Sequence, residues 1–280
     1  MGRANPSPSV VNEMVKRPLP LRLAPDRLRI ALWSRFYRGK CSALPLYQSA
    51  TLRHVPNITM ELVPGDIISD CIAFTGVYEP ALTRRIIQMA QRGGTLVEIG
   101  TNLGYFALLW AACAPSNRCI AFEPSPRNVD FLRRNVARNG LDEQILVVPS
   151  AAGMEPGRLR FDIGPTDQNG WGGLTLDQNE RCIEVDVVRV DDVIRSNDSI
   201  AILKVDTEGA DAWALMGCDR LLKERRVREI WYEQNKPRMA ALGIRADAAQ
   251  EYLRSVGYTP TPQNNPADEL VEWSAIPTVA

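Results

Sequence analysis

The chain has 280 residues, of which 45% are hydrophobic, so it can bury the core of one large domain or of two small ones. Its 33 basic residues balance its 33 acidic residues, and this neutrality argues against a nucleic-acid partner. No apolar run approaches the roughly 18 residues of a membrane span, no secretion signal is visible, and the six cysteines are scattered, so we expect a cytoplasmic protein with reduced thiols.

Residues 1–50 are predicted to form a basic, Pro-rich N-terminal extension. Five prolines in residues 1–26 predict a loosely ordered arm. Residues 27–38 mix arginines with apolar residues and predict a short basic helix. Such a helix can lie on an anionic membrane surface, cover an edge of its own domain, or pack on a second copy in a homodimer.

Residues 51–280 are predicted to form one α/β domain, because apolar strands alternate with helices along most of this range. Near-continuous apolar strands predict a mostly parallel sheet with helices on both faces. Residues 153–182 interrupt the alternation and predict a hairpin plus a loop over one end of the sheet. The predicted strands are 57–64, 95–100, 118–123, 145–149, 184–190, 200–206, 227–233, 257–261 and 269–275, and the predicted helices are 81–90, 105–113, 127–139, 209–224 and 246–255.

The turn after the strand at 95–100 reads V-E-I-G-T-N-L-G-Y-F and predicts a ligand site, because open α/β sheets bind ligands at the carboxyl ends of their strands. Gly100 and Gly104 would let a ligand approach the backbone. Thr101 stands where a dinucleotide-binding loop usually carries its second glycine. Glu123 ends the next strand, near the spacing of roughly 20 residues at which a carboxylate accepts ribose hydroxyls. The pair of strand ends therefore predicts a nucleoside site.

Glu98, two residues before the first glycine, indicates which nucleoside derivative binds. A carboxylate there suits a ligand with an ammonium and a sulfonium group and does not suit phosphates. S-adenosylmethionine fits, with Glu98 and the loop at its methionyl end and Glu123 at its ribose. A nucleotide-dependent oxidoreductase is an alternative, against which Glu98 and the missing second glycine count. A catalytically silent binding protein of the same fold is another, against which the intact site residues count.

Three segments carry a family resemblance: L-V-E-I-G-T-N-L-G-Y-F, A-F-E-P-S-P-R-N-V-D-F-L-R-R-N and L-K-V-D-T-E-G-A-D. Together they resemble the FkbM family of S-adenosylmethionine-dependent methyltransferases, over roughly residues 58–275. The resemblance implies a Rossmann-like class I methyltransferase fold with a seven-stranded sheet, and O-methylation of a hydroxyl on a sugar, glycan or natural product. It further implies cofactor contacts from Glu98, Gly100, Asn102, Gly104 and Glu123, and a reacting end formed by Lys204, Asp206 and Glu208.

An alcohol must lose a proton to accept a methyl group, so a base is expected near the reacting end. The only histidine, His54, precedes the core and is expected to be structural. Asp206 follows a buried strand, with Lys204 two residues earlier on the same face, and is our candidate base. The alternatives for Asp206 are a structural ion pair or a helix cap. Glu208 lies either at the reacting end or in a helix's first turn, where the helix dipole favours an acid.

Glu233 ends the next predicted strand, at the same edge of the sheet as Asp206. The two carboxylates could share a proton, bind substrate hydroxyls, or hold Mg²⁺ with water. We expect no dedicated metal site, because two carboxylates without a histidine are a poor ligand set. Glu79 is a further candidate for a cofactor contact. The N-G-W-G-G segment around Trp171 predicts either a lid or sugar-stacking loop, or a plain turn with a buried indole.

Overall fold

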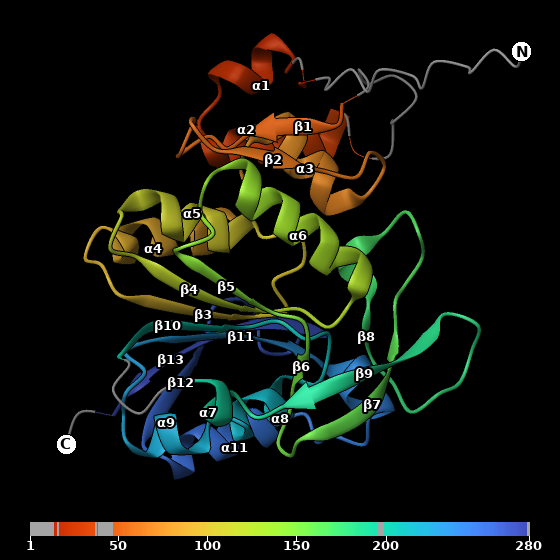
Figure 1. The fold of residues 1–280 in the computed structure, drawn as a ribbon, viewed down its shortest axis with the longest axis vertical. Coiled ribbons are helices and arrows are strands. Elements are labelled where there is room, and N and C mark those ends of the chain that lie inside the picture. Colours follow the sequence, from red (N-terminus) through yellow and green to blue (C-terminus); the bar gives the residue numbers. More distant parts are fainter. Residues whose placement is uncertain (1–13, 16, 37, 39–46, 195–198, 279–280) are drawn as a thin grey trace, which may run out of the picture.

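A seven-stranded sheet forms the centre of the computed structural model, which describes residues 14–15, 17–36, 38, 47–194 and 199–278 (Figure 1). Its strand order is β12-β13-β11-β10-β3-β4-β5. The strands are β3 (Thr95–Ile99), β4 (Arg118–Phe122), β5 (Ile145–Val148), β10 (Ile200–Val205), β11 (Ile230–Asn235), β12 (Tyr258–Pro262) and β13 (Leu270–Pro277). Most of the predicted arm, and Cys41, lie outside the described residues.

Five strands of this sheet run parallel, from β11 through β10, β3 and β4 to β5. β13 is antiparallel to both of its neighbours, β11 on one side and β12 on the other. The chain order reverses direction at β3, so the carboxyl ends of β3 and β10 form a switch point of the kind where α/β folds bind ligands. The predicted fold class, a Rossmann-like and mostly parallel sheet with helices on both faces, is confirmed.

Helices cover the two faces of the sheet and bury two separate apolar cores (Figure 1). One face carries α4 (Pro80–Ala90), α5 (Tyr105–Cys113) and α6 (Pro126–Arg138), and the other carries α7 (Val190–Val193), α8 (Asp211–Met216), α9 (Asp219–Lys223) and α11 (Ala248–Ser255). Successive strand residues alternate between the faces, so Leu96 packs with the first group and Val97 with the second. By the same alternation Glu98 and Lys204 belong to the face that α5 covers.

The N-terminal elements form a layer over α4, α5 and α6, at the top of Figure 1. They are α1 (Leu19–Leu23), α2 (Asp26–Phe36), β1 (Ser49–Thr51), β2 (Thr59–Glu61) and α3 (Ile67–Thr75). The predicted helix at 27–38 is α2, and it buries Arg29 and Trp33, so this helix covers part of its own protein. Membrane contact by the helix and the domain boundary at residue 50 stay predictions. None of the helices in the described ranges is long and apolar enough to cross a membrane.

The predicted hairpin and loop between residues 153 and 182 form a small second sheet, at the lower right of Figure 1. Its strand order is β6-β9-β7-β8, with β7 and β9 antiparallel. The strands are β6 (Ala151–Ala152), β7 (Gly157–Asp162), β8 (Gly173–Leu174) and β9 (Cys182–Val188). A 3₁₀ turn, η2 (Asn169–Trp171), lies between β7 and β8 and contacts α3 and α6.

The helices differ from the prediction in two ways. The single helix expected at 209–224 is wrong, because α8 ends at Met216 and α9 begins at Asp219. The break lies where a Cβ on Gly217 would stand 2.2 Å from the carbonyl oxygen of Gly153, so the chain turns beneath the second sheet. Four helices were not predicted, namely α1, α3, α7 and α10 (Lys236–Ala241). Of these, α1 lies within residues 1–26, so the prediction of a loosely ordered arm is wrong for Leu19–Leu23.

Candidate active site

A cavity opens at the carboxyl ends of β3, β4 and β10, between the glycine loop, α3 and the η2 turn. Its apolar wall comes from the N-terminal layer and α5. The polar lining comes from strand ends and loops far apart in the sequence. The polar lining residues are Glu98, Thr101, Asn102, Glu123, Asn128, Ser150, Asn169, Lys204, Asp206, Thr207, Glu208 and Glu233. The cavity thus collects most of the predicted site residues in one place.

Glu98 is buried in the floor of this cavity, with 1% of its surface exposed. It stands in register with Lys204 of β10 on one side and with Ala121 of β4 on the other. Burial raises the pKa of its carboxyl to about 8, against the opposing effect of the Lys204 ammonium. Its Oε2 has no hydrogen-bond partner among the described residues. A carboxylate of this kind is suited to a cationic ligand, whose charge would favour the ionised form.

Glu123 ties the glycine loop to the end of β4. Its Oε2 accepts a hydrogen bond from the backbone N–H of Asn102 (2.8 Å), and its Oε1 accepts from the N–H of Ser125 (3.0 Å). Burial raises its pKa to about 7, and these hydrogen bonds partly oppose the rise. Each carboxylate oxygen can accept a second hydrogen bond, so Glu123 can bind ribose hydroxyls while it holds the loop. Asn102 itself has a left-handed backbone, with φ of 54°.

The fold requires glycine at both Gly100 and Gly104. The sequence alone did not indicate this requirement. A Cβ on Gly100 would lie 1.7 Å from the carbonyl oxygen of Asp206, so the ends of β3 and β10 could not approach. A Cβ on Gly104 would lie 2.6 Å from Cδ1 of Leu132 on α6, and Gly104 has φ of 99°. Thr101 lines the cavity, while its hydroxyl hydrogen bonds with the carbonyl of Glu98 (3.1 Å). Cofactor contacts by these three residues stay predictions.

Lys204 and Asp206 form an ion pair at the end of β10, with Nζ 3.0 Å from Oδ2. Burial lowers the pKa of the Lys204 ammonium, but the carboxylates of Asp206, Glu98 and Glu79 outweigh burial and raise it, so Lys204 stays charged. Its ammonium also lies 5.3 Å from the ring centre of Phe106. The Asp206 side chain keeps 28% of its surface exposed toward the cavity, whereas Lys204 keeps 6%. Asp206 can therefore reach a bound substrate and Lys204 supports it from behind.

Glu208 and Glu233 complete an acidic edge beside Asp206. Oxygens of the three carboxylates can lie within 4.8 Å of one another, a geometry that could hold a metal ion. Glu208 accepts a hydrogen bond from Asn235 Nδ2 (3.1 Å) and pairs with Arg238 (3.3 Å), and burial raises its pKa to about 7. The expectation of no metal site stays a prediction.

Glu233 differs from Asp206 in its surroundings. Burial, followed by the charges of Asp206, Glu208 and Asp211, raises the pKa of Glu233 far above its usual range. Its Oε1 has no partner among the described residues. Glu233 is therefore protonated near neutral pH and can donate a hydrogen bond from its carboxyl. This arrangement favours Asp206 over Glu233 as the base.

Glu79 lies on the far side of the ion pair, where a small second cavity is lined by Glu79, Asp206 and Glu233 together with Glu272. Burial raises the pKa of Glu79, and Lys204 opposes that rise. Its backbone is left-handed, with φ of 41°, at the start of α4. Glu79 thus approaches the predicted reacting end but is absent from the lining of the main cavity, and its cofactor contact stays a prediction.

Four residues near the site were not predicted: Asn128, Asn169, Asp211 and Glu272. Asp211 is buried and accepts hydrogen bonds from Thr207 and from the N–H of Glu233 (3.2 Å), so it holds two strand ends together. The sequence signal that could have indicated Asp211 was its position four residues after Thr207. Trp171 has 52% of its surface exposed, so the alternative of a buried indole is wrong.

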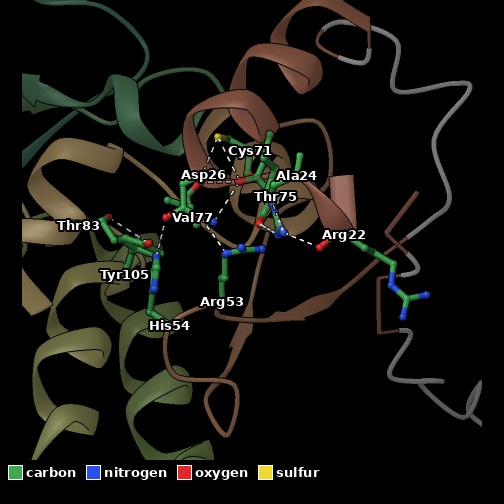
Figure 2. A network of polar contacts seen from close by, with 11 residues as sticks. Arg22, Ala24, Asp26, Arg53, His54, Cys71, Thr75, Val77, Thr83 and Tyr105 are labelled. Carbon is green, nitrogen blue, oxygen red and sulfur yellow. Dashed lines mark hydrogen bonds and ion pairs between the residues drawn. The ribbon is translucent and has the colours of Figure 1, made fainter. Parts of the chain in front are cut away.

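His54 lies away from the cavity and binds Asp26 through Nε2 at 2.9 Å (Figure 2). Arg53 pairs with the same carboxylate at 2.8 Å. This contact joins the segment before β2 to the start of α2, as expected of a structural residue.

The model of the FkbM methyltransferase domain matches residues 98–260, more than half of the chain. The chain belongs to the FkbM methyltransferase family. A curated relative, methyltransferase sdnD of Sordaria araneosa, is 26% identical in an alignment of 201 residues that covers 58% of this chain and 76% of the relative. The family resemblance is confirmed, and methyl transfer is confirmed as the class of reaction.

Two solved structures show distant similarity. The precorrin-6y C5,15-methyltransferase of Geobacter metallireducens has a TM-score of 0.42 and 11% identity, over 71% of this chain and 90% of that one. The M1A22 tRNA methyltransferase of B. subtilis has a TM-score of 0.40 and 13% identity, over 70% of this chain and 69% of that one. The fold assignment rests on the strand order described above.

Proposed function

We propose that the protein is an S-adenosylmethionine-dependent O-methyltransferase acting on a hydroxyl of a sugar, glycan or natural product. The observation that carries the proposal is the row of Glu98, Lys204 and Asp206 at the carboxyl ends of neighbouring strands. Glu98 offers an unpartnered buried carboxylate to a cationic ligand, and Asp206 offers an exposed carboxylate to a hydroxyl. Methyl transfer needs both features, because the cationic ligand is the methyl donor and the hydroxyl is the methyl acceptor.

The chain's residues fit S-adenosylmethionine as the donor. Glu98 suits the ammonium and sulfonium charges, and Glu123 with the loop of Asn102 suits the ribose hydroxyls. When bound, the cofactor supplies an electrophilic methyl group. The apolar wall of Ile68, Ile72 and Phe106 excludes water from that part of the cavity.

Asp206 is the proton acceptor in this proposal. Its carboxylate takes the proton of the acceptor hydroxyl, while the Lys204 ammonium, 3.0 Å away, holds the carboxylate in place and stays protonated itself. Protonated Glu233 donates a hydrogen bond that orients the acceptor. Trp171, exposed on the turn beside the cavity, offers an aromatic face on which a sugar can stack.

Further proposals concern the partners and the location. We infer that the acceptor is a small molecule or glycan and that no nucleic acid is bound, in keeping with the neutral net charge. A cytoplasmic location is supported by five described cysteines that form no disulfide, namely Cys71, Cys113, Cys119, Cys182 and Cys218.

Two measurements test the proposed function. Calorimetry should show binding of S-adenosylmethionine and S-adenosylhomocysteine and no binding of NADH, whereas NADH binding would favour an oxidoreductase. A comparison of metabolites and glycans from cells with and without the protein should reveal a product heavier by one methyl group. Cofactor binding without such a product, and without methyl transfer to any extract, would indicate the silent binding protein instead.

A further inference from the structure

Several buried polar atoms that face the main cavity have no hydrogen-bond partner among the described residues. Besides Glu98 Oε2 they belong to three asparagines: Oδ1 of Asn102, Oδ1 of Asn128, and both Nδ2 and Oδ1 of Asn169. Asn128 and Asn169 have only 4% and 2% of their surface exposed. Leaving such amide groups unpaired is costly, so a native protein normally supplies a partner for them.

Asn169 is the most completely unpaired of the three, although its backbone is held firmly. Its N–H donates to Oδ1 of Asp66 (3.0 Å), the residue that caps the start of α3. Its carbonyl accepts from Nδ2 of Asn128 (3.2 Å). A Cβ on Gly170 would lie 2.5 Å from Ile68, so the turn is packed directly against α3. The backbone contacts therefore hold the turn in place and leave the side-chain amide available.

The same contacts place Asn169 beside the carboxylate predicted to bind ribose. Nδ2 of Asn128 donates both to the Asn169 carbonyl and to Oε1 of Glu123 (3.4 Å). Oε2 of Glu123 is bound by the N–H of Asn102. Glu123, Asn102, Asn128 and Asn169 thus surround one region of the cavity, and each has an oxygen with room for a hydrogen-bond donor.

The chemistry of this region matches a vicinal diol. A ribose presents two neighbouring hydroxyls, each of which donates one hydrogen bond and accepts others. Glu123 and Asn128 supply acceptors only, because Nδ2 of Asn128 already donates to the Asn169 carbonyl and to Glu123. The Asn169 amide supplies an acceptor and, through Nδ2, a donor that neither of those two side chains offers.

We propose that Asn169, carried by the small second sheet, is a ribose-binding residue that acts together with Glu123. The proposal rests on the proposed function, since it assumes an adenosyl cofactor in this cavity. It gives the inserted sheet a direct part in cofactor binding. It also explains why the η2 turn is fastened to both α3 and α6.

The test is calorimetry with S-adenosylhomocysteine and with its 2′-deoxy and 3′-deoxy analogues. The parent protein should bind the natural ligand more tightly than both analogues. Asn169→Ala should lose roughly tenfold for the natural ligand, the effect of one buried hydrogen bond, and lose little for at least one deoxy analogue. Asn169→Leu, which fills a similar volume, should show the same selective loss.

Asn179→Ala is the matched control, because Asn179 lies in the loop between β8 and β9 of the same inserted sheet and its amide donates to Asp162 (3.1 Å) at the surface. This control should bind all three ligands as the parent does. An equal loss of all ligands in Asn169→Ala, no loss at all, or failure of both Asn169 variants to fold would overturn the assignment. If the parent binds none of these ligands, the proposed function itself fails.

Discussion

Asp206 and Glu233 show how two carboxyl groups at one edge of a sheet acquire different properties. Asp206 is partly exposed and paired with Lys204, whereas Glu233 is buried among like charges that keep it protonated. A carboxylate can accept a proton from a hydroxyl, whereas a protonated carboxyl has an O–H that donates a hydrogen bond. The division of roles follows from the neighbours of each side chain, since both follow apolar strands in similar sequence contexts.

We expect Asp206→Asn to bind S-adenosylmethionine nearly as the parent does but to lose turnover by about 10²–10⁴-fold, the usual contribution of a general base. Glu233→Gln should lose less, because glutamine also donates a hydrogen bond in place of the protonated carboxyl. Single-turnover methyl transfer across pH, with cofactor affinity measured alongside, separates the two effects. Parental rates in Asp206→Asn with an inactive Glu233→Gln would reverse the roles, and an unfolded Asp206→Asn would make Asp206 structural.

The same carboxylates allow a sharp test of metal dependence. Asp206, Glu208 and Glu233 can approach closely enough to hold a cation, yet Lys204 and Arg238 already neutralise two of them. We therefore expect methyl transfer to survive exhaustive EDTA treatment. Activity that disappears with EDTA and returns with Mg²⁺ would show that these residues are metal ligands.

At the scale of elements, the carboxyl end of α3 is capped by arginines from the N-terminal layer. Arg29, with 2% of its surface exposed, donates to the carbonyls of Thr75 (2.6 Å), Arg22 (2.7 Å) and Ala24 (3.2 Å), residues that lie together in Figure 2. Arg17 donates to Ala73 (2.8 Å). Guanidinium groups suit the last carbonyls of a helix and its negative end. Helix α2 and the segment before α1 are thereby fastened to α3, a helix that lines the cavity.

We expect Arg29→Met to lower the free energy of unfolding by about 2–4 kcal/mol, because three carbonyls, two of them buried, lose a charged donor while the aliphatic packing is kept. Urea denaturation measures the loss. Arg27→Ala, an exposed arginine on the same helix, is the matched control and should change stability by less than about 0.5 kcal/mol. Equal stability of the two variants would show that the cap contributes little.

The elements that the sequence predicted well are those with long periodic patterns and clear ends. α5 was predicted at 105–113 and found at Tyr105–Cys113, because a strand and a glycine loop precede it. α3 was missed, since I-I-S-D-C-I-A-F-T has no amphipathic period and buries its polar Ser69, Asp70 and Thr75 along with apolar residues, although Asp66 and Gly76 cap its two ends. Its burial on several sides explains the missing period.

The site was predictable where it depends on strand ends and not where it depends on tertiary packing. Glu98, Glu123, Lys204, Asp206 and Glu233 follow from the strand pattern and meet in or beside the cavity. The need for glycine at position 100 arises from the approach of a strand distant in sequence, which no local pattern records. Asn169 reaches the cavity only through the folding of the inserted sheet.

At the scale of the whole molecule, several buried carboxyl groups share raised pKa values: Glu98 (about 8), Glu123 (about 7) and Asp211 (about 6), each chiefly because of burial. In the unfolded chain these groups titrate near pH 4–4.5. Between that pH and about 8 the folded protein therefore binds more protons than the unfolded chain. Its stability must fall as pH rises through this window.

We expect the urea midpoint of the ligand-free protein to decrease from pH 5 to pH 8, and the decrease to be smaller in Glu98→Gln, which cannot ionise. A cationic cofactor should favour ionised Glu98 and release protons on binding near pH 7, which calorimetry in buffers of different ionisation enthalpy detects. A midpoint that rises over the same range would show that these carboxyls are ionised in the folded protein.

The pairing of β3 with β10 has a consequence for how the protein is made. These strands place Glu98 beside Lys204, but the whole of β4, β5 and the inserted sheet is synthesised between them. Contacts between residues far apart in sequence form late, because a long loop must close first. A growing chain therefore has β3 unpaired on one side until β10 leaves the ribosome, and an open strand edge invites association with other chains. Retention on immobilised S-adenosylhomocysteine would then select completed, correctly folded molecules from a mixture of nascent and misfolded ones.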